Sequence, residues 1–202
     1  DLDPEKVNSI NAGKSFLKHF SSKSIAEQVD AGRFEATTDP SRISEVNAIL
    51  ICVPTPLDDH REPDLSFVLD TARTIAPHMP EGVLVTLEST TYPGTTEEDL
   101  RTVLEEGSNM KAGEGFHLAY SPEREDPGRL DASVKTIPKV VGGFTPKCTE
   151  LASSLYGKAL DRIHLVSSCK AAEATKLLEN IFRSVNIALV NELKVVYEAM
   201  GI

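Results

Sequence analysis

Short apolar runs alternate with helix-like stretches along most of the chain, and this alternation constrains the fold more than any other feature. The runs with the length and composition of buried strands are 46–53, 82–89, 116–120, 139–143 and 162–166. Helical spacing, or acidic first turns and a closing glycine, mark 64–79, 94–107 and 145–159 as helices. Strands and helices in this order predict βαβ units, so we expect an α/β fold with a parallel sheet covered by helices on both faces.

The first forty residues predict a smaller set of elements. A helix is expected over 3–13, with Asp3 as its N-cap, Pro4 in its first turn and Gly13 just beyond its end. A short strand is expected over 34–38. A doubly wound sheet normally opens with a strand, a glycine-rich turn and a helix. Because this chain begins where a second strand would finish, we expect the first βα unit to be missing.

A long helix is predicted at the carboxyl-terminal end. Residues 167–200 contain no glycine or proline, and Ser167 or Ser168 can cap their start. Apolar residues form a stripe along this helix, which would be roughly 50 Å long and would outgrow one domain. We therefore predict an α/β domain over 1–166, followed over 167–202 by a long connecting helix that offers a homodimer face.

Composition excludes several classes of function. Lysine and arginine number 21 against 31 acidic residues, so the net charge of −10 argues against nucleic-acid binding. No apolar run reaches the ~18 residues of a membrane helix. The three cysteines, Cys52, Cys148 and Cys169, and the scattered histidines fit no metal motif. We expect a reduced, cytoplasmic protein without a metal site, and we expect Cys52 to lie in the core because its neighbours are apolar.

In open parallel sheets, ligands bind beyond the carboxyl ends of the strands. Val53, Pro54 and Thr55 follow one predicted strand, and the prolines leave the Thr55 amide and hydroxyl available for a ligand. A rigid turn without a ligand explains the same residues. Asp1 stands where a second strand would end, a place from which a carboxylate can accept hydrogen bonds from ribose hydroxyls. Alternatively, Asp1 simply faces solvent.

A second strand end is crowded with polar side chains. Glu88, Ser89, Thr90 and Thr91 are consecutive at the end of the run 82–89. The amino terminus of the helix predicted next favours an anion. Capping by serine or threonine is the alternative, although four adjacent polar residues exceed what one cap needs.

The stretch AYSPEREDPG (119–128) follows the next strand along the chain. Its acidic residues lie between Pro122 and Pro127. A carboxylate such as Glu123 at this position can act as a general base, particularly if burial raises its pKa. A solvated turn remains the alternative.

Two polar residues share a face near the start of the long helix. Lys176 and Asn180 are spaced i, i+4. If that face looks into the cleft, Lys176 supplies a cation for a phosphate or a developing oxyanion, and Asn180 can bind a sugar hydroxyl or water. Otherwise the pair belongs to a solvated helix face.

Together these segments resemble the nucleotide-sugar 6-dehydrogenases, the UDP-glucose/GDP-mannose dehydrogenase family. The segments that carry the resemblance are Asp1, ICVPTP (51–56), ESTTYPGTT (88–96), SPERE-PG (121–128), KVVGG (139–143) and EATKLLENIFRSVNIALVNE (173–192). They occur in order over nearly the whole chain, and several look most like the branch that acts on UDP-N-acetylhexosamines. The resemblance implies a Rossmann-type NAD domain and a central dimerisation domain that begins with the long helix.

The resemblance also implies a reaction and a set of site residues. Family members oxidise the C6 alcohol of a UDP-sugar to a carboxylate in two hydride transfers to NAD, for polysaccharide precursors. The implied NAD contacts are Asp1 at the ribose, then Val53, Pro54, Thr55, Glu88, Ser89 and Thr90. The implied catalytic residues are Thr91 and Asn180 for water or the reacting oxygen, Glu123 for protons, and Lys176 for the oxyanion.

The chain departs from the family pattern in three places. The family's nucleophilic cysteine, which forms the thiohemiacetal and thioester, lies beyond the long helix, and none of the three cysteines here matches it. The glycine-rich phosphate loop and the UDP-binding domain are also absent from these residues. We therefore expect a fragment that binds NAD poorly and turns over nothing by itself.

Two other functions remain open from the sequence. One is a non-catalytic dimerisation or scaffold module, and the other is a Rossmann-type hydroxy-acid dehydrogenase, against which the SPERE-PG loop argues. An enzyme requires Thr91, Glu123 and Lys176 to converge on one cavity, whereas a scaffold permits them to be scattered.

Overall fold

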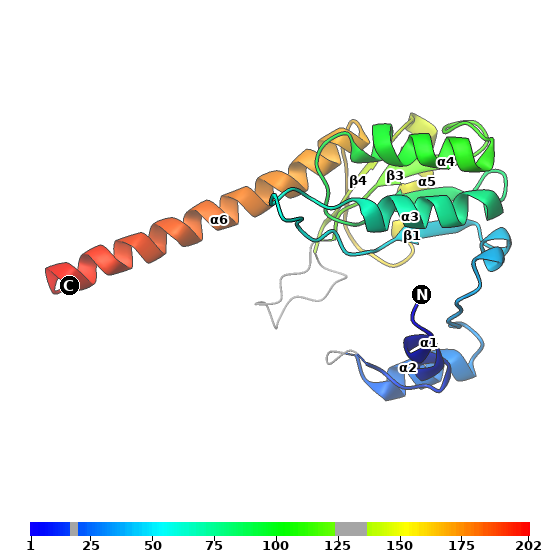
Figure 1. Cartoon of the computed structure of the whole chain (residues 1–202), viewed down its shortest axis with the longest axis horizontal. Helices are drawn as coiled ribbons and strands as arrows, with labels where there is room; N and C mark the ends of the chain where they lie inside the picture. Colours follow the sequence, from blue (N-terminus) through cyan, green and yellow to red (C-terminus); the bar gives the residue numbers. More distant parts are fainter. Residues whose placement is uncertain (17–19, 124–136) are drawn as a thin grey trace. The chain divides into compact units, whose positions relative to one another are not determined.

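The computed structural model describes residues 1–16, 20–123 and 137–202, and the chain divides into two compact units, residues 1–42 and 43–202. Within the described residues of the larger unit, five strands form one sheet in the order β1-β2-β3-β4-β5 (Figure 1). The strands are β1 (Ala48–Ile51), β2 (Leu84–Leu87), β3 (His117–Tyr120), β4 (Lys139–Gly143) and β5 (Ile163–Leu165). Each coincides with one of the predicted apolar runs.

The direction of β4 differs from the prediction. Strands β1, β2 and β3 are parallel, but β4 pairs antiparallel with β3, and β5 is parallel to β4. An apolar run that is buried on both faces has the same pattern in either direction, so the sequence could not distinguish them. As a result, the first residue of β4 lies at the same end of the sheet as the carboxyl end of β3.

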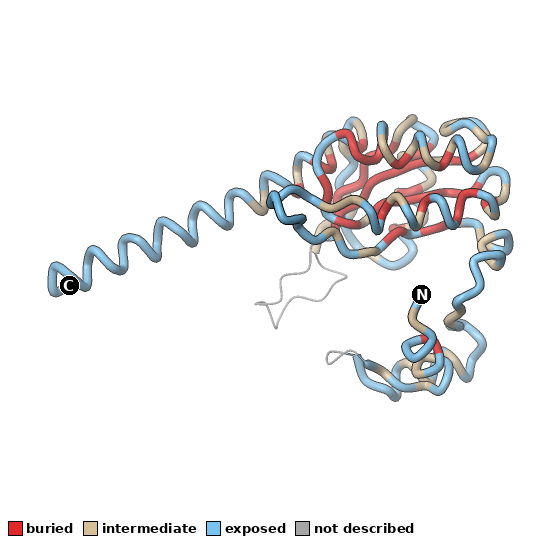
Figure 2. Tube along the Cα trace, viewed as in Figure 1, coloured by how far each residue is buried: buried red, intermediate tan, exposed pale blue. Residues whose placement is uncertain are grey.

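Helices cover both faces of the sheet, as predicted. One core cluster joins residues such as Val85, Leu87 and Leu118 to helices α3 (Ser66–Ile75) and α4 (Arg101–Ser108). The other cluster packs the opposite face against α5 (Pro146–Tyr156). In Figure 2 the buried residues concentrate in the strands of the sheet and in parts of the helices around it. A short helix η2 (Ala76–His78) follows α3.

The stretch predicted as one helix over 94–107 is a π-helical segment, η3 (Thr95–Leu100), continued by α4. Gly107 does not end this helix. It lies inside α4, where an added Cβ would stand 2.6 Å from the Ala76 Cβ, so close packing explains the glycine. Asn109, in the left-handed conformation, is the C-cap.

Cys52 is exposed, so its assignment to the core was wrong. It follows β1, which is an edge strand of the sheet, and Leu50 in β1 is 44% exposed. An edge strand leaves apolar residues uncovered that a central strand would bury.

The smaller unit contains α1 (Pro4–Asn11) and α2 (Ser22–Asp30), and η1 (Pro40–Glu45) begins at its end. The Asp3 carboxylate accepts the Glu5 amide and Gly13 has a φ of +69°, which confirms the predicted caps. The expected strand over 34–38 is not formed. Instead, the backbone of Ala36 exchanges two hydrogen bonds with the Asn11 side chain.

The long helix α6 (Cys169–Met200) is confirmed, and Ser168 is its N-cap. Only its first turns contribute buried residues, which are Cys169, Ala172, Glu173 and Lys176. From residue 181 onward α6 is exposed (Figure 2). Among the described helices none is long and apolar enough to cross a membrane.

Candidate functional site

A cleft of about 320 Å³ opens at the carboxyl ends of β1 and β2. Its walls are the loop after β1, the loop after β2, and Glu123, which follows β3. The lining residues are Cys52, Val53, Pro54, Thr55, Glu88, Ser89, Thr90 and Glu123. Three segments predicted independently as strand ends therefore meet in one cavity, because β1, β2 and β3 are parallel neighbours.

Hydrogen bonds hold the two loops of the cleft together. The Thr55 hydroxyl donates to the Thr90 carbonyl at 2.7 Å, and the Ser89 hydroxyl donates to the Val53 carbonyl at 2.6 Å. The Tyr120 hydroxyl donates to the Ser89 carbonyl at 3.2 Å from β3. These three side chains thus donate to backbone carbonyls of the loops that would otherwise lack a partner. The hydrogen bonds fix the shape of the loops before a ligand binds.

Both oxygens of the Glu88 carboxylate in the cleft have a partner. One oxygen accepts the Lys139 ammonium at 2.8 Å and the other accepts the Tyr156 hydroxyl at 2.6 Å. Both Glu88 and Lys139 side chains are nearly buried, at 11% and 10% exposure. Burial, together with the Glu88 charge, raises the pKa of Tyr156 and keeps its hydroxyl a donor. Lys139 and Tyr156 were not predicted, since they lie 51 and 68 residues from Glu88 in sequence.

Glu123 and Lys176 meet beside the cleft. The Glu123 amide donates to the Glu88 carbonyl at 3.4 Å, and the buried Lys176 ammonium donates to the Glu123 carbonyl. The face of α6 that carries Lys176 therefore looks toward this strand end rather than into solvent. Asn180, one turn later, is half-buried, and its Oδ1 accepts from Arg183.

Thr91 follows the lining residue Thr90 and is 4% exposed. Its hydroxyl is fully buried and lies near the Tyr120 hydroxyl, but it forms no hydrogen bond of good geometry among the residues that the structure describes. A buried hydroxyl without a well-formed hydrogen bond is uncommon and costs free energy.

Two further predicted features remain. Asp1 belongs to the smaller unit, where its carboxylate accepts the Asp3 amide at 2.9 Å. Arg124, Glu125, Asp126 and Pro127 lie outside the described residues.

The thiol of Cys52 lines the cleft but is not activated. Although the residue is exposed, partial burial of the thiol and the nearby Glu88 carboxylate raise the pKa of Cys52 to about 11. The thiolate, which is the nucleophilic form, is therefore scarce at neutral pH.

Comparisons with known proteins agree with this geometry. Residues 1–160 match the model of the UDP-glucose/GDP-mannose dehydrogenase family, NAD binding domain, and residues 170–202 match that family's central domain. The UDP-N-acetyl-D-glucosamine 6-dehydrogenase of Pseudomonas aeruginosa is 41% identical over 178 residues, which cover 88% of this chain and 42% of that protein. The UDP-N-acetyl-D-mannosamine dehydrogenase of Escherichia coli (strain K12) is 37% identical over 100% of this chain and 49% of its own length.

Solved structures give the same result. The UDP-D-ManNAc dehydrogenase structure from Pyrococcus horikoshii matches with a TM-score of 0.93 and 35% identity, over 100% of this chain and 48% of that one. The NDP-N-acetyl-D-galactosaminuronic acid dehydrogenase of Methanosarcina mazei Go1 matches with a TM-score of 0.84 and 40% identity, over 98% and 43%. The chain spans about half the length of these relatives. By fold, family models and sequence identity, it belongs to the UDP-glucose/GDP-mannose dehydrogenase family.

Proposed function

We propose that this chain is the NAD-binding core, and the start of the central domain, of a nucleotide-sugar 6-dehydrogenase. The enzyme oxidises the C6 alcohol of a UDP-sugar to a carboxylate in two hydride transfers. The observation that carries the proposal is the contact between Lys176 and the Glu123 carbonyl beside the cleft, because it joins two chemically suited residues from distant segments. Convergence of this kind favours an enzyme over a scaffold.

The cleft residues fit an NAD cofactor. The cavity lies at the carboxyl ends of parallel strands, where dinucleotides bind in doubly wound sheets, and Val53, Pro54, Thr55, Ser89 and Thr90 would hold it. The buried Thr91 hydroxyl offers one more polar group, which forms no hydrogen bond of good geometry among the described residues. When bound there, NAD accepts the hydride in each oxidation step.

The chain's own residues would serve the two steps as follows. Lys176 places an ammonium beside the cleft, where it stabilises negative charge that develops on the C6 oxygen. Glu123, with its exposed side chain at the cleft wall, takes up the proton that the alcohol or water loses. Thr91 and Asn180 orient the reacting oxygen or the water. Glu88 lines the cleft and, with both oxygens paired, fixes its shape.

The favoured substrate is a UDP-N-acetylhexosamine, and its product would be a precursor for polysaccharide synthesis in the cytoplasm. The names of the matched relatives from Pseudomonas aeruginosa and Escherichia coli support this choice. We also propose that residues 1–166 act as the NAD domain and that residues 167–202 begin the dimerisation domain. The exposed apolar residues of α6 support a homodimer.

The proposal is tested by measuring the dehydrogenase activity of the full-length protein. We expect NADH formation, followed by absorbance, with UDP-N-acetylglucosamine or UDP-N-acetylmannosamine, and two NADH for each sugar oxidised. Lys176→Met should lower kcat roughly 100-fold or more, because it removes an oxyanion donor. Lys111→Met is the matched control, since the Lys111 side chain is 71% exposed, pairs with Glu105 and is not part of the cleft lining. A Lys176→Met variant with unchanged kcat would refute the assigned role.

A further inference from the structure

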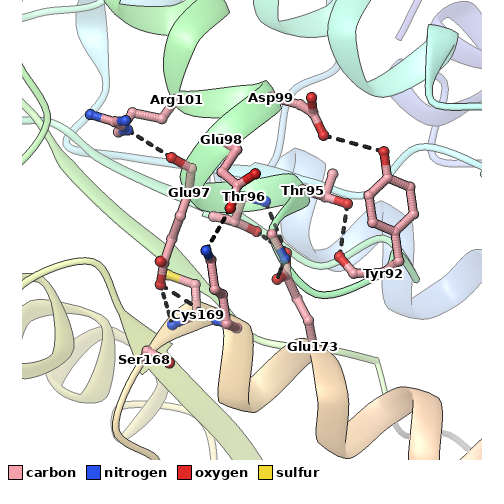
Figure 3. Close-up of polar contacts among 12 residues, drawn as sticks. Tyr92, Thr95, Thr96, Glu97, Glu98, Asp99, Arg101, Ser168, Cys169 and Glu173 are labelled. Carbon is pink, nitrogen blue, oxygen red and sulfur yellow. Dashed lines mark hydrogen bonds and ion pairs between the residues drawn. The ribbon is translucent and has the colours of Figure 1, made fainter.

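The start of α6 is docked by a buried carboxylate. Glu173 is 0% exposed, and one of its oxygens accepts the Gly94 amide at 2.7 Å. The other oxygen accepts the Thr96 amide at 2.9 Å and the Thr96 hydroxyl at 2.7 Å, as Figure 3 shows. Three donors therefore compensate a charge that would be costly to bury alone.

The docking is reciprocal. Glu97 in η3 accepts the amides of Cys169 and Lys170, at 3.1 and 3.4 Å, at the amino terminus of α6 (Figure 3). Glu173 in α6 accepts amides at the amino terminus of η3. Each helix thus caps the other with a glutamate, and we call this pair of carboxylates the reciprocal cap (Glu97 and Glu173).

Residues next to either helix start do not satisfy all of its first backbone amides. The N-cap of η3 is Gly94, with a φ of +111°, and it has no side chain to accept the orphan amides. Ser168 caps α6 through the Ala171 amide, which leaves the Cys169 and Lys170 amides for Glu97. A carboxylate at a helix amino terminus is also favoured by the helix dipole.

Close packing on β4 at Gly142 brings the start of α6 to the sheet, but few large apolar side chains of α6 take part. Besides Glu173 and Lys176, its buried residues are the small Cys169 and Ala172, and from residue 181 onward the described helix is exposed. Glu173 and Lys176 are spaced i, i+3, so they lie on one face of the helix. Fixing Glu173 on η3 therefore fixes the rotation and height at which Lys176 reaches the Glu123 carbonyl.

We propose that Glu173 and Glu97 are positioning residues: the reciprocal cap holds Lys176 at the cleft for the oxidation steps. This inference rests on the proposed function, in which Lys176 stabilises the C6 oxyanion. Because a misplacement of about 1 Å can cost on the order of 100-fold in rate, a loosened α6 should lower kcat with little change in the KM for NAD.

A double-mutant cycle on the full-length protein tests this. In Glu173→Gln the amide nitrogen faces at least one of the three donors, so α6 should shift, and kcat should fall about tenfold or more. In a Lys176→Met background the same substitution should have almost no further effect, because the group that it positions is gone. Glu106→Gln, an exposed change on α4, is the control and should leave kcat unchanged.

The outcomes separate the two proposals. If Lys176→Met leaves kcat unchanged, the proposed function fails, and the positioning role fails with it. Suppose that Lys176→Met lowers kcat, but that Glu173→Gln lowers kcat by the same factor in the wild type and in the Lys176→Met variant. The proposed function then stands, and the positioning role is wrong. Should Glu173→Gln not unfold cooperatively, Glu97→Gln replaces it in the same cycle, since Glu97 is only half-buried.

Discussion

At the scale of single residues, the hydrogen bonds of buried polar side chains help to separate residues that stabilise the packing from candidates for a functional role. Ser89, Tyr120 and Glu88 near the cleft all have partners of good geometry. Thr91 and Thr86 are the buried residues whose hydroxyls have no hydrogen bond within the described part of the chain. Only Thr91 adjoins the cleft lining, whereas Thr86 lies within β2. The two threonines therefore form a natural pair for comparison.

Thr91→Val should separate stability from function. Replacing an unpaired buried hydroxyl by a methyl group should leave the free energy of unfolding unchanged or raise it by up to about 1 kcal/mol. If the hydroxyl orients a reacting oxygen, kcat should fall at least roughly tenfold. Chemical denaturation and initial rates of NADH formation measure the two effects.

Thr86→Val is the matched control for that experiment. It should change stability to the same extent and leave kcat as it is, because Thr86 lies within β2, before Glu88, the first lining residue of that segment, whereas Thr91 directly follows the lining residue Thr90. Equal loss of kcat in both variants would contradict the role of Thr91. Marked destabilisation by Thr91→Val would show instead that its hydroxyl has a partner.

At the scale of elements, β4 explains why the segment KVVGG ends in two glycines. A Cβ on Gly142 would lie 2.1 Å from the Ser168 carbonyl oxygen, at the N-cap of α6. A Cβ on Gly143 would lie 2.3 Å from the Thr149 amide nitrogen in α5. The glycines therefore let two helices approach one strand, and they do not mark a turn.

The contact between β3 and α5 should make stability depend on pH. Burial, and then the Lys147 charge, lower the pKa of His117, whose Nδ1 is 3.8 Å from the Cys148 sulfur. The folded state therefore binds this proton less readily than the unfolded state. The contribution of His117 to stability should be complete above the unfolded pKa of about 6.5 and should be lost as pH falls from there through the folded pKa.

Unfolding of the wild type and of His117→Gln between pH 5 and pH 8 measures this effect. The difference in unfolding free energy between them should shift in favour of the variant as the pH falls, since glutamine takes up no proton. A constant difference over the whole range would mean that His117 has the same pKa in both states.

At the scale of the whole molecule, residues 181–200 of α6 carry large apolar side chains that the described chain leaves exposed. Its large apolar residues with at least half of their surface exposed are Ile181, Phe182, Val185, Ile187, Leu189, Val190, Val195 and Met200. Large apolar side chains that are exposed in this number on one helix are typical of an interface between proteins. It is the basis on which we propose the homodimer.

Charge on this surface should weaken self-association. In sedimentation experiments the wild type should have twice the mass of one chain, and Val185→Glu combined with Leu189→Glu should shift the protein toward monomer. Burying a carboxylate without a partner in an apolar interface is strongly unfavourable. Lys194→Gln, also on α6 and 71% exposed in its side chain, should not change the mass. A wild type that remains monomeric at high concentration would rule out this dimer.

The sequence by itself determined the elements and much of the cleft. Strands, the caps of α1 and the start of α6 follow from local spacing and capping residues. Val53, Thr55, Ser89 and Glu123 could be expected in one cavity, because the ends of parallel neighbouring strands meet at one sheet edge.

The tertiary structure decided the direction of β4, the partners of Glu88 and the reciprocal cap of Glu97 and Glu173. The hydrogen bonds of Glu88, Glu97 and Glu173 join residues about 50 to 80 positions apart, such as Glu173 with Thr96. Local periodicity reports which face of an element is apolar, but it does not report which distant donor meets a given carboxylate. That pairing exists only once the packed elements bring the two groups within hydrogen-bonding distance.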